Sequence, residues 1–185
     1  MILVRHARPK LDPAVDCADW GLSADGRARS RLLADRLRRF APGAVYSSPE
    51  PKALATAEIV GTTLGLGVAE ILELREHDRT GVPFFSVPGE FEERMSRLFE
   101  HQGECVFGTE SAAAALARFR HGINRVLSPG NRQPLVFTHG TVMSLYIAAE
   151  TGLDAAEIWR ELSMPCYVVF SEESRSWSGV EHVTP

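Results

Sequence analysis

The stretch Met1-Ile2-Leu3-Val4-Arg5-His6-Ala7 places a cation and an imidazole directly after a short apolar run. An unbroken apolar run of this length predicts a strand that is buried on both faces. In open α/β sheets, ligands bind in the crevice outside the carboxyl ends of the strands. Arg5 and His6 therefore indicate an anion-binding site that contains a candidate nucleophile.

A second apolar run far downstream repeats this pattern. Leu135 to Phe137 is apolar and is followed by Thr138-His139-Gly140. A single histidine at a strand end is usually an ordinary residue. Two histidines at the same edge of a sheet, one beside Arg5 and one beside Gly140, favour a functional site.

Length and composition indicate one ordinary globular domain. The chain has 185 residues, of which 44% are hydrophobic and 24% charged, with a net charge of -4. This charge gives no basic field, so nucleic acid is not an expected partner. No apolar run reaches the ~20 residues of a membrane span, and no signal peptide precedes the first strand, so no membrane association is expected.

The cysteine and metal-ligand patterns predict neither a disulfide framework nor a metal site. The three cysteines Cys17, Cys105 and Cys166 are widely spaced, which predicts reduced thiols and a cytoplasmic location. No Cys/His spacing resembles a zinc site, and no carboxylate cluster suggests a metal cage. The sequence therefore predicts no metal and no cofactor.

Strands alternate with helices along the chain, which predicts an α/β fold. We expect a three-layer αβα sandwich with a mostly parallel central sheet and helices on both faces, formed by residues 1–185 as a single domain. Residues 77–108 interrupt the alternation and are predicted to form a lid or substrate-specificity insertion. The polar segment after Ser171 is expected to be loosely held.

The segment Ser47-Ser48-Pro49 predicts the start of a helix after a strand, with Ser48 as N-cap and Pro49 in the first helical position. Lys52 then lies in the first turn. Helix N-termini attract anions, so Lys52 is a candidate phosphate ligand. A surface lysine explains the same position equally well.

Taken in order, these motifs have a match. Their elements are Leu3-Val4-Arg5-His6-Ala7, Leu22-Ser23-Ala24-Asp25-Gly26, Ser47-Ser48-Pro49 through Lys52-Ala53 and Thr56-Ala57, Leu74-Arg75-Glu76, Gly108-Thr109-Glu110-Ser111 and Thr138-His139-Gly140. The chain resembles the histidine phosphatase superfamily, also called the phosphoglycerate mutase-like family, over nearly its whole length.

The resemblance implies a role for each matching residue. His6 would be the nucleophile and form a phosphohistidine, which water then hydrolyses. Arg5, His139 and Lys52 would bind the phosphoryl oxygens, and Glu76 would protonate the leaving oxygen and then activate water. The catalytic set is thus Arg5, His6, Glu76 and His139, without a metal.

The chain departs from the family pattern at several positions. Ala7 stands where glycine is usual, and Arg8-Pro9-Lys10-Leu11-Asp12 stands where the family often has ExTxxN. Arg8 is a candidate anion contact or a solvent-facing loop residue, and we favour the loop residue. Lys52 replaces the second arginine, and a lysine lacks the planar fork of a guanidinium, which predicts weaker phosphate binding. Glu73 and Asp78 flank Glu76 and are alternative acids.

The leading functional hypothesis is a phosphatase that acts on a phosphomonoester, either a small molecule or a phosphorylated protein. A phosphoglycerate-mutase-type phosphotransfer is the alternative within the family, and a phosphohistidine-protein phosphatase is a further one. A non-catalytic phosphate-binding module of the same fold belongs to a different class. The oligomeric state is not predicted.

Overall fold

The computed structural model describes residues 1–127, 132–171 and 173–183. In this part of the chain the strands form one sheet in the order β3-β2-β4-β1-β5-β6, and β7 also pairs with β5. The strands are β1 (Ile2–Arg5), β2 (Val45–Ser47), β3 (Val68–Glu70), β4 (Leu135–Thr138), β5 (Cys166–Ser171), β6 (Ser176–Trp177) and β7 (Glu181–His182).

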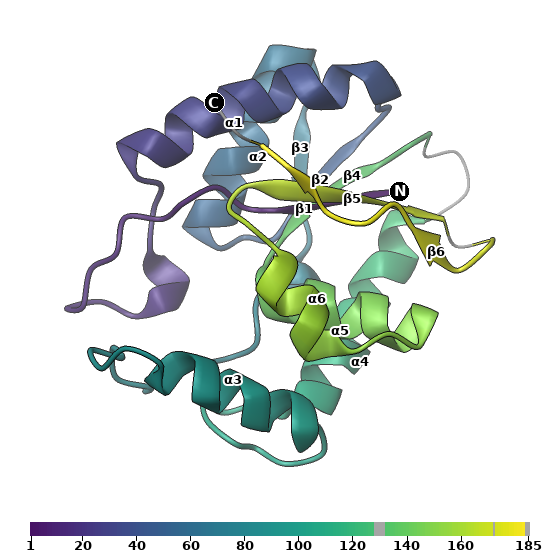
Figure 1. The fold of residues 1–185 in the computed structure, drawn as a ribbon. Helices are drawn as coiled ribbons and strands as arrows, with labels where there is room; N and C mark the ends of the chain where they lie inside the picture. The colour runs from purple at the N-terminus through teal and green to yellow at the C-terminus, as the bar shows by residue number, and fades with distance from the viewer. Residues whose placement is uncertain (128–131, 172, 184–185) are drawn as a thin grey trace.

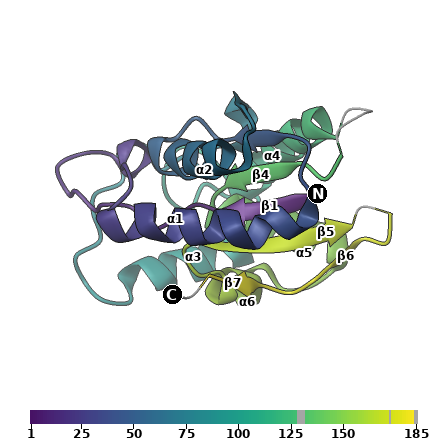
Figure 2. The same cartoon turned by 90° about the horizontal axis from the view of Figure 1, so that it is seen from above.

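Helices cover both faces of this sheet, as Figure 1 shows. Helices α1 (Ala24–Leu37) and α2 (Pro51–Leu64) lie on one face, and α4 (Ala112–Val126), α5 (Gly140–Thr151) and α6 (Ala155–Glu161) lie on the other. Helix α3 (Glu90–Glu100) packs outside this second layer, against α6. Figure 2, seen from above, shows α1 and α2 side by side over the sheet. The predicted three-layer fold is confirmed.

Strand β1 occupies the centre because both of its faces are apolar. Ile2 and Val4 pack in one core cluster with residues of α1 and α2, while Leu3 packs in the other with residues of α4 and α5. All three side chains are fully buried. The unbroken apolar run predicted from the sequence is thus the strand on which both helical layers rest.

The register of the parallel strands brings their carboxyl ends to one edge. Arg5 of β1 pairs with Thr138 of β4, and Ser47 of β2 pairs with Phe137 of β4. The residues that follow each strand therefore emerge side by side. In both ribbon views the loop after β1 and the segment before α3 project from this same edge.

Two local predictions from the sequence are wrong. Helix α2 begins at Pro51 with Glu50 as N-cap, not at Pro49 with Ser48 as N-cap. A residue that precedes proline avoids the α-helical region, and Glu50 is indeed extended, with ψ 131°. The segment after Ser171 is not loose throughout, because β6 and β7 both pair with β5.

The first turn of α1 packs directly on the loop that leaves β1. The Ser23 hydroxyl accepts the Gly26 N–H at 3.0 Å and donates to the Arg8 carbonyl at 3.0 Å. A Cβ at Gly26 would lie 2.2 Å from the Arg8 carbonyl oxygen, which only glycine avoids. This contact fixes the path of the chain just beyond His6.

Among the residues that the structure describes, no helix is long and apolar enough to cross a membrane.

Candidate active site

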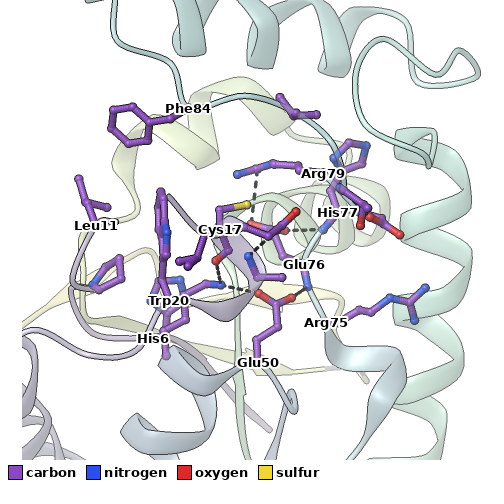
Figure 3. A pocket seen from close by; sticks show the side chains of 18 of the residues that line it. His6, Leu11, Cys17, Trp20, Glu50, Arg75, Glu76, His77, Arg79 and Phe84 are labelled. Carbon is purple, nitrogen blue, oxygen red and sulfur yellow. Dashed lines mark hydrogen bonds and ion pairs between the residues drawn. The ribbon is translucent and has the colours of Figure 1, made fainter. Parts of the chain in front are cut away.

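The carboxyl ends of β1 and β2 open into a cavity of about 470 Å³. Arg5, His6, Lys52 and Glu76 line it, so four of the five residues predicted for the site share one cavity, of which Figure 3 labels His6 and Glu76. His139 lies directly behind them, fully buried, with its ring centroid 5.1 Å from that of His6. The structure therefore brings together all five predicted residues.

The hydrogen bond of His6 determines which ring nitrogen is free. Nδ1 lies 2.8 Å from the Ala7 carbonyl oxygen. A carbonyl oxygen only accepts, so Nδ1 carries the hydrogen and Nε2 keeps its lone pair. Burial, reinforced by the nearby His139 and Lys52, holds the pKa of His6 well below its usual range. The ring is therefore neutral at pH 7, as a nucleophile must be.

His139 is held by the loop after β2. Its Nε2 lies 2.8 Å from the Ser48 hydroxyl, while its Nδ1 has no hydrogen-bond partner among the described residues. Burial and then the charge of Lys52 lower the pKa of His139 well below the usual value. An anion that entered the site would supply the missing negative partner.

Arg5 is a partly buried cation whose direction is set by two neighbours. Its guanidinium donates to the carbonyl oxygen of Leu162, whereas its Nε has no partner within the described part of the chain. A Cβ at Gly140 would lie 3.0 Å from Arg5 Cζ, so glycine at this position leaves room for the guanidinium. Gly140 also begins α5, whose N-terminus faces the same edge.

Glu50 is a site residue that the sequence interpretation missed. Its carboxylate accepts from Lys52 Nζ at 2.5 Å and from the Glu76 backbone N–H at 2.6 Å. The same carboxylate lies 3.5 Å from His139 Nε2. Lys52 itself is buried and also donates to the Cys17 carbonyl at 2.8 Å. Lys52 is thus not a free surface lysine, because the Glu50 carboxylate forms an ion pair with it.

Glu76 is held by the N-terminus of α5. Its carboxylate accepts the backbone N–H groups of Thr141 at 3.1 Å and Val142 at 3.2 Å. Arg79 lies 3.7 Å away and donates to the Thr141 hydroxyl at 2.8 Å. Burial alone would raise the pKa of Glu76, but Arg79, His139 and the backbone N–H groups outweigh it and hold that pKa far below the usual value. Glu76 is ionised in the ligand-free site.

The loop that carries Glu76 is fixed from behind by Arg118 of α4. The Arg118 guanidinium donates to the carbonyl oxygens of Glu73, Arg75 and Glu76, each at 2.9 Å. It also forms two hydrogen bonds, at 2.9 and 2.7 Å, with the Glu110 carboxylate. Glu110 belongs to a motif noted in the sequence, whereas nothing near Arg118 marked it as a positioning residue.

Of the two alternative acids, Glu73 lies outside the cavity, whereas Asp78 lines it. Glu73 pairs with Arg125 at 2.8 Å on the surface, and Asp78 accepts the Thr80 N–H at 2.9 Å. His77 Nε2 lies 2.6 Å from the Glu110 carbonyl, so it supports the loop. Arg8 is exposed and does not line the cavity. The exposed position of Arg8 agrees with its interpretation as a solvent-facing loop residue.

No group of three or more histidine, cysteine or acidic side chains is placed to hold a metal ion within the described ranges. Cys17, Cys105 and Cys166 are all free thiols.

An α/β sandwich with paired histidines and two cations at one sheet edge is typical of phosphoryl-transfer proteins. The model of the histidine phosphatase superfamily (branch 1) matches residues 1–183. The chain therefore belongs to the histidine phosphatase superfamily. This finding confirms the predicted family and the phosphatase class, while the role of each site residue remains a prediction.

Individual relatives agree with this assignment. The chain is 28% identical to phosphoserine phosphatase 1 of Hydrogenobacter thermophilus, over 86% of this chain and 79% of that protein. Mycobacterial glucosyl-3-phosphoglycerate phosphatase has a similar structure, with a TM-score of 0.72, 20% identity and coverage of 91% and 87%. Phosphoserine phosphatase of Entamoeba histolytica gives a TM-score of 0.69 at 18% identity, with coverage of 92% and 90%. These two structures show the same fold.

Proposed function

We propose that this protein hydrolyses a phosphomonoester through a phosphohistidine on His6, without a metal. The observation that carries the proposal is the neutral His6 ring, with Nδ1 bonded to the Ala7 carbonyl and Nε2 free, at the wall of a cavity that Arg5 and Lys52 also line. Phosphoryl transfer depends on positioning and on neutralising the phosphoryl oxygens. Two cations beside a fixed nucleophile meet both needs.

In this proposal Nε2 of His6 attacks phosphorus and the bond to the leaving oxygen breaks. Arg5, Lys52 and His139 bind the phosphoryl oxygens during the transfer. Water then attacks the phosphohistidine, releases inorganic phosphate and restores the neutral ring. The named substrates of the relatives, phosphoserine and glucosyl-3-phosphoglycerate, support a small phosphomonoester as the substrate.

Glu76 is proposed as the group that exchanges the proton. A phosphate dianion beside it disfavours its ionised form and raises its pKa from the low value of the ligand-free site. Glu76 can then protonate the leaving alkoxide and later accept a proton from water. An aryloxide leaves readily without a proton, so Glu76→Gln should slow alkyl phosphates much more than nitrophenyl phosphate. Equal losses on both esters would contradict this role.

The central test compares phosphate release by wild type, His6→Ala and His101→Ala, with a metal chelator present. His101 is half-exposed, lies outside the cavity and serves as the matched control. We expect turnover in wild type and His101→Ala and none in His6→Ala. Alkaline quenching after incubation with a substrate that carries a labelled phosphate should trap the label on wild type and His101→Ala but not on His6→Ala. Turnover that survives in His6→Ala would overturn the proposal, and phosphate returned to a second substrate alcohol would indicate a mutase.

A further inference from the structure

The outer part of the cavity is far more apolar than its floor. Two surface loops form it, residues 8–22 after β1 and residues 79–89 before α3, and both contribute large apolar side chains to the lining. Leu11, Val15 and Phe84 line the cavity although they are 56%, 46% and 42% exposed, respectively. We call Leu11, Val15, Trp20 and Phe84 the apolar rim.

The two loops contact each other through side chains of the apolar rim. The ring centroids of Trp20 and Phe84 are 6.1 Å apart at an interplanar angle of 59°. The indole N–H of Trp20 donates to the Asp12 carbonyl at 2.9 Å, so its polar edge is already used. In Figure 3, Leu11, Trp20 and Phe84 stand together on one side of the cavity above His6, whereas Arg75 and His77 lie on the other.

Some charged side chains near the rim form hydrogen bonds within the protein itself. Asp16 accepts the Ala18 N–H at 2.9 Å, and Asp78 accepts that of Thr80 at 2.9 Å. Arg79 donates to the Thr141 hydroxyl, and its guanidinium carbon lies 5.0 Å from the Phe91 ring centroid. Among the described residues of the lining, Arg79 Nε and His77 Nδ1 have no hydrogen-bond partner, but only an apolar leaving group would cover the exposed apolar surface of the rim.

We propose that the substrate is a phosphomonoester whose alcohol carries an uncharged, planar aromatic body, held against the apolar rim while its phosphate lies at His6. This inference rests on the proposed function and adds the chemical class of the leaving group. The rim and the phosphate-binding floor belong to one cavity, so a single molecule reaches both. Its volume of about 470 Å³ falls within the range of small-molecule binding pockets.

The test uses phosphates of primary alcohols, so that intrinsic reactivity is matched: 2-naphthylmethyl phosphate, ethyl phosphate and phosphoserine. We expect kcat/KM to be at least about tenfold higher for the naphthylmethyl ester. Phe84→Ala and Leu11→Ala should each lower that value about 3- to 10-fold and leave ethyl phosphate within about twofold. Leu72→Ala, which removes a 62% exposed leucine outside the cavity, is the control and should change neither.

The outcomes separate this inference from the proposed function. If His6→Ala abolishes turnover but phosphoserine or ethyl phosphate is preferred, the proposed function stands and the aromatic class is refuted. Equal losses on all esters in Phe84→Ala would also refute it. If no ester is hydrolysed, the proposed function fails, and the role of the apolar rim is tested by calorimetry with naphthylmethylphosphonate and ethylphosphonate. Tighter binding of naphthylmethylphosphonate that is lost in Phe84→Ala would support aromatic binding at the rim. Equal binding of the two phosphonates would overturn it.

Discussion

Replacing Glu50 with glutamine removes one negative charge from a site that must bind a phosphate dianion. The amide keeps the shape of the side chain and can still accept the Glu76 N–H that the carboxylate accepts at 2.6 Å. Lys52, now 2.5 Å from a carboxylate oxygen, would lose that ionic partner. We therefore expect Glu50→Gln to bind inorganic phosphate more tightly than the wild type.

The magnitude follows from the geometry. A phosphoryl oxygen that accepts from the same Lys52 ammonium as Glu50 lies within about 6 Å of its carboxylate, because each hydrogen bond spans about 2.8 Å. Two unit charges at about 6 Å repel by roughly 0.7 kcal/mol at the dielectric constant of water and by roughly 3 kcal/mol at an effective value of about 20. The expected gain of about 1–3 kcal/mol corresponds to roughly 5- to 150-fold in the dissociation constant of phosphate.

Isothermal titration calorimetry with phosphate measures this gain directly. Glu104→Gln is the matched control, since it removes an equal charge at a 73% exposed side chain outside the cavity. Lys52→Arg examines the other member of the pair and should also tighten phosphate, through the planar fork of arginine. Unchanged or weaker phosphate binding in a folded Glu50→Gln protein would refute the idea that Glu50 opposes the substrate's charge.

Three further predictions concern the support of the site. Arg118→Lys should lower the free energy of unfolding by about 2–4 kcal/mol in urea titrations and also lower kcat, because one ammonium cannot replace the guanidinium that holds the Glu76 loop; an unaffected kcat would contradict that positioning role. Because His6 stays neutral when folded and gains a proton when unfolded, its contribution to stability is complete above the usual histidine pKa of about 6.5 and is lost as the pH falls below it. His6→Asn should therefore reduce the slope of stability against pH in that range by up to about 1.4 kcal/mol per pH unit, and an identical slope would argue against a neutral buried ring. Gly26→Ala should destabilise by about 2 kcal/mol or more because its Cβ would meet a carbonyl oxygen at 2.2 Å, whereas Gly21→Ala, with open space around it, should melt like wild type.

The sequence was sufficient for those site residues that directly follow a buried strand. Apolar runs at β1 and β4 predicted both strands, and the pairing of Arg5 with Thr138 places His6 and His139 at one edge, as expected. Parallel strands align their carboxyl ends, so local patterns alone determine which side chains emerge together. The strand-end motifs therefore indicated which residues would share an edge without any knowledge of which strands pair.

Glu50 and Arg118 were beyond this kind of inference for different physical reasons. The sequence predicted that helix α2 begins at Pro49, which would make Glu50 helical, but the helix begins two residues later, at Pro51. The extended backbone of Glu50 and its reach toward His139 were therefore not foreseen. Arg118 lies 42 residues from Glu76 in the sequence and resembles any other arginine on an amphipathic helix. Only packing shows which helical arginine points inward.

The central position of β1 has a consequence for synthesis of the chain. Both neighbours of β1 come from the last third of the sequence, and Met1 donates a hydrogen bond to Phe170, 169 residues away. At translation speeds of roughly 5–20 residues per second, the apolar strand waits on the order of ten seconds or more for its partners. Residues 1–4 are therefore an apolar segment that stays without its native strand partners for most of the synthesis of the chain.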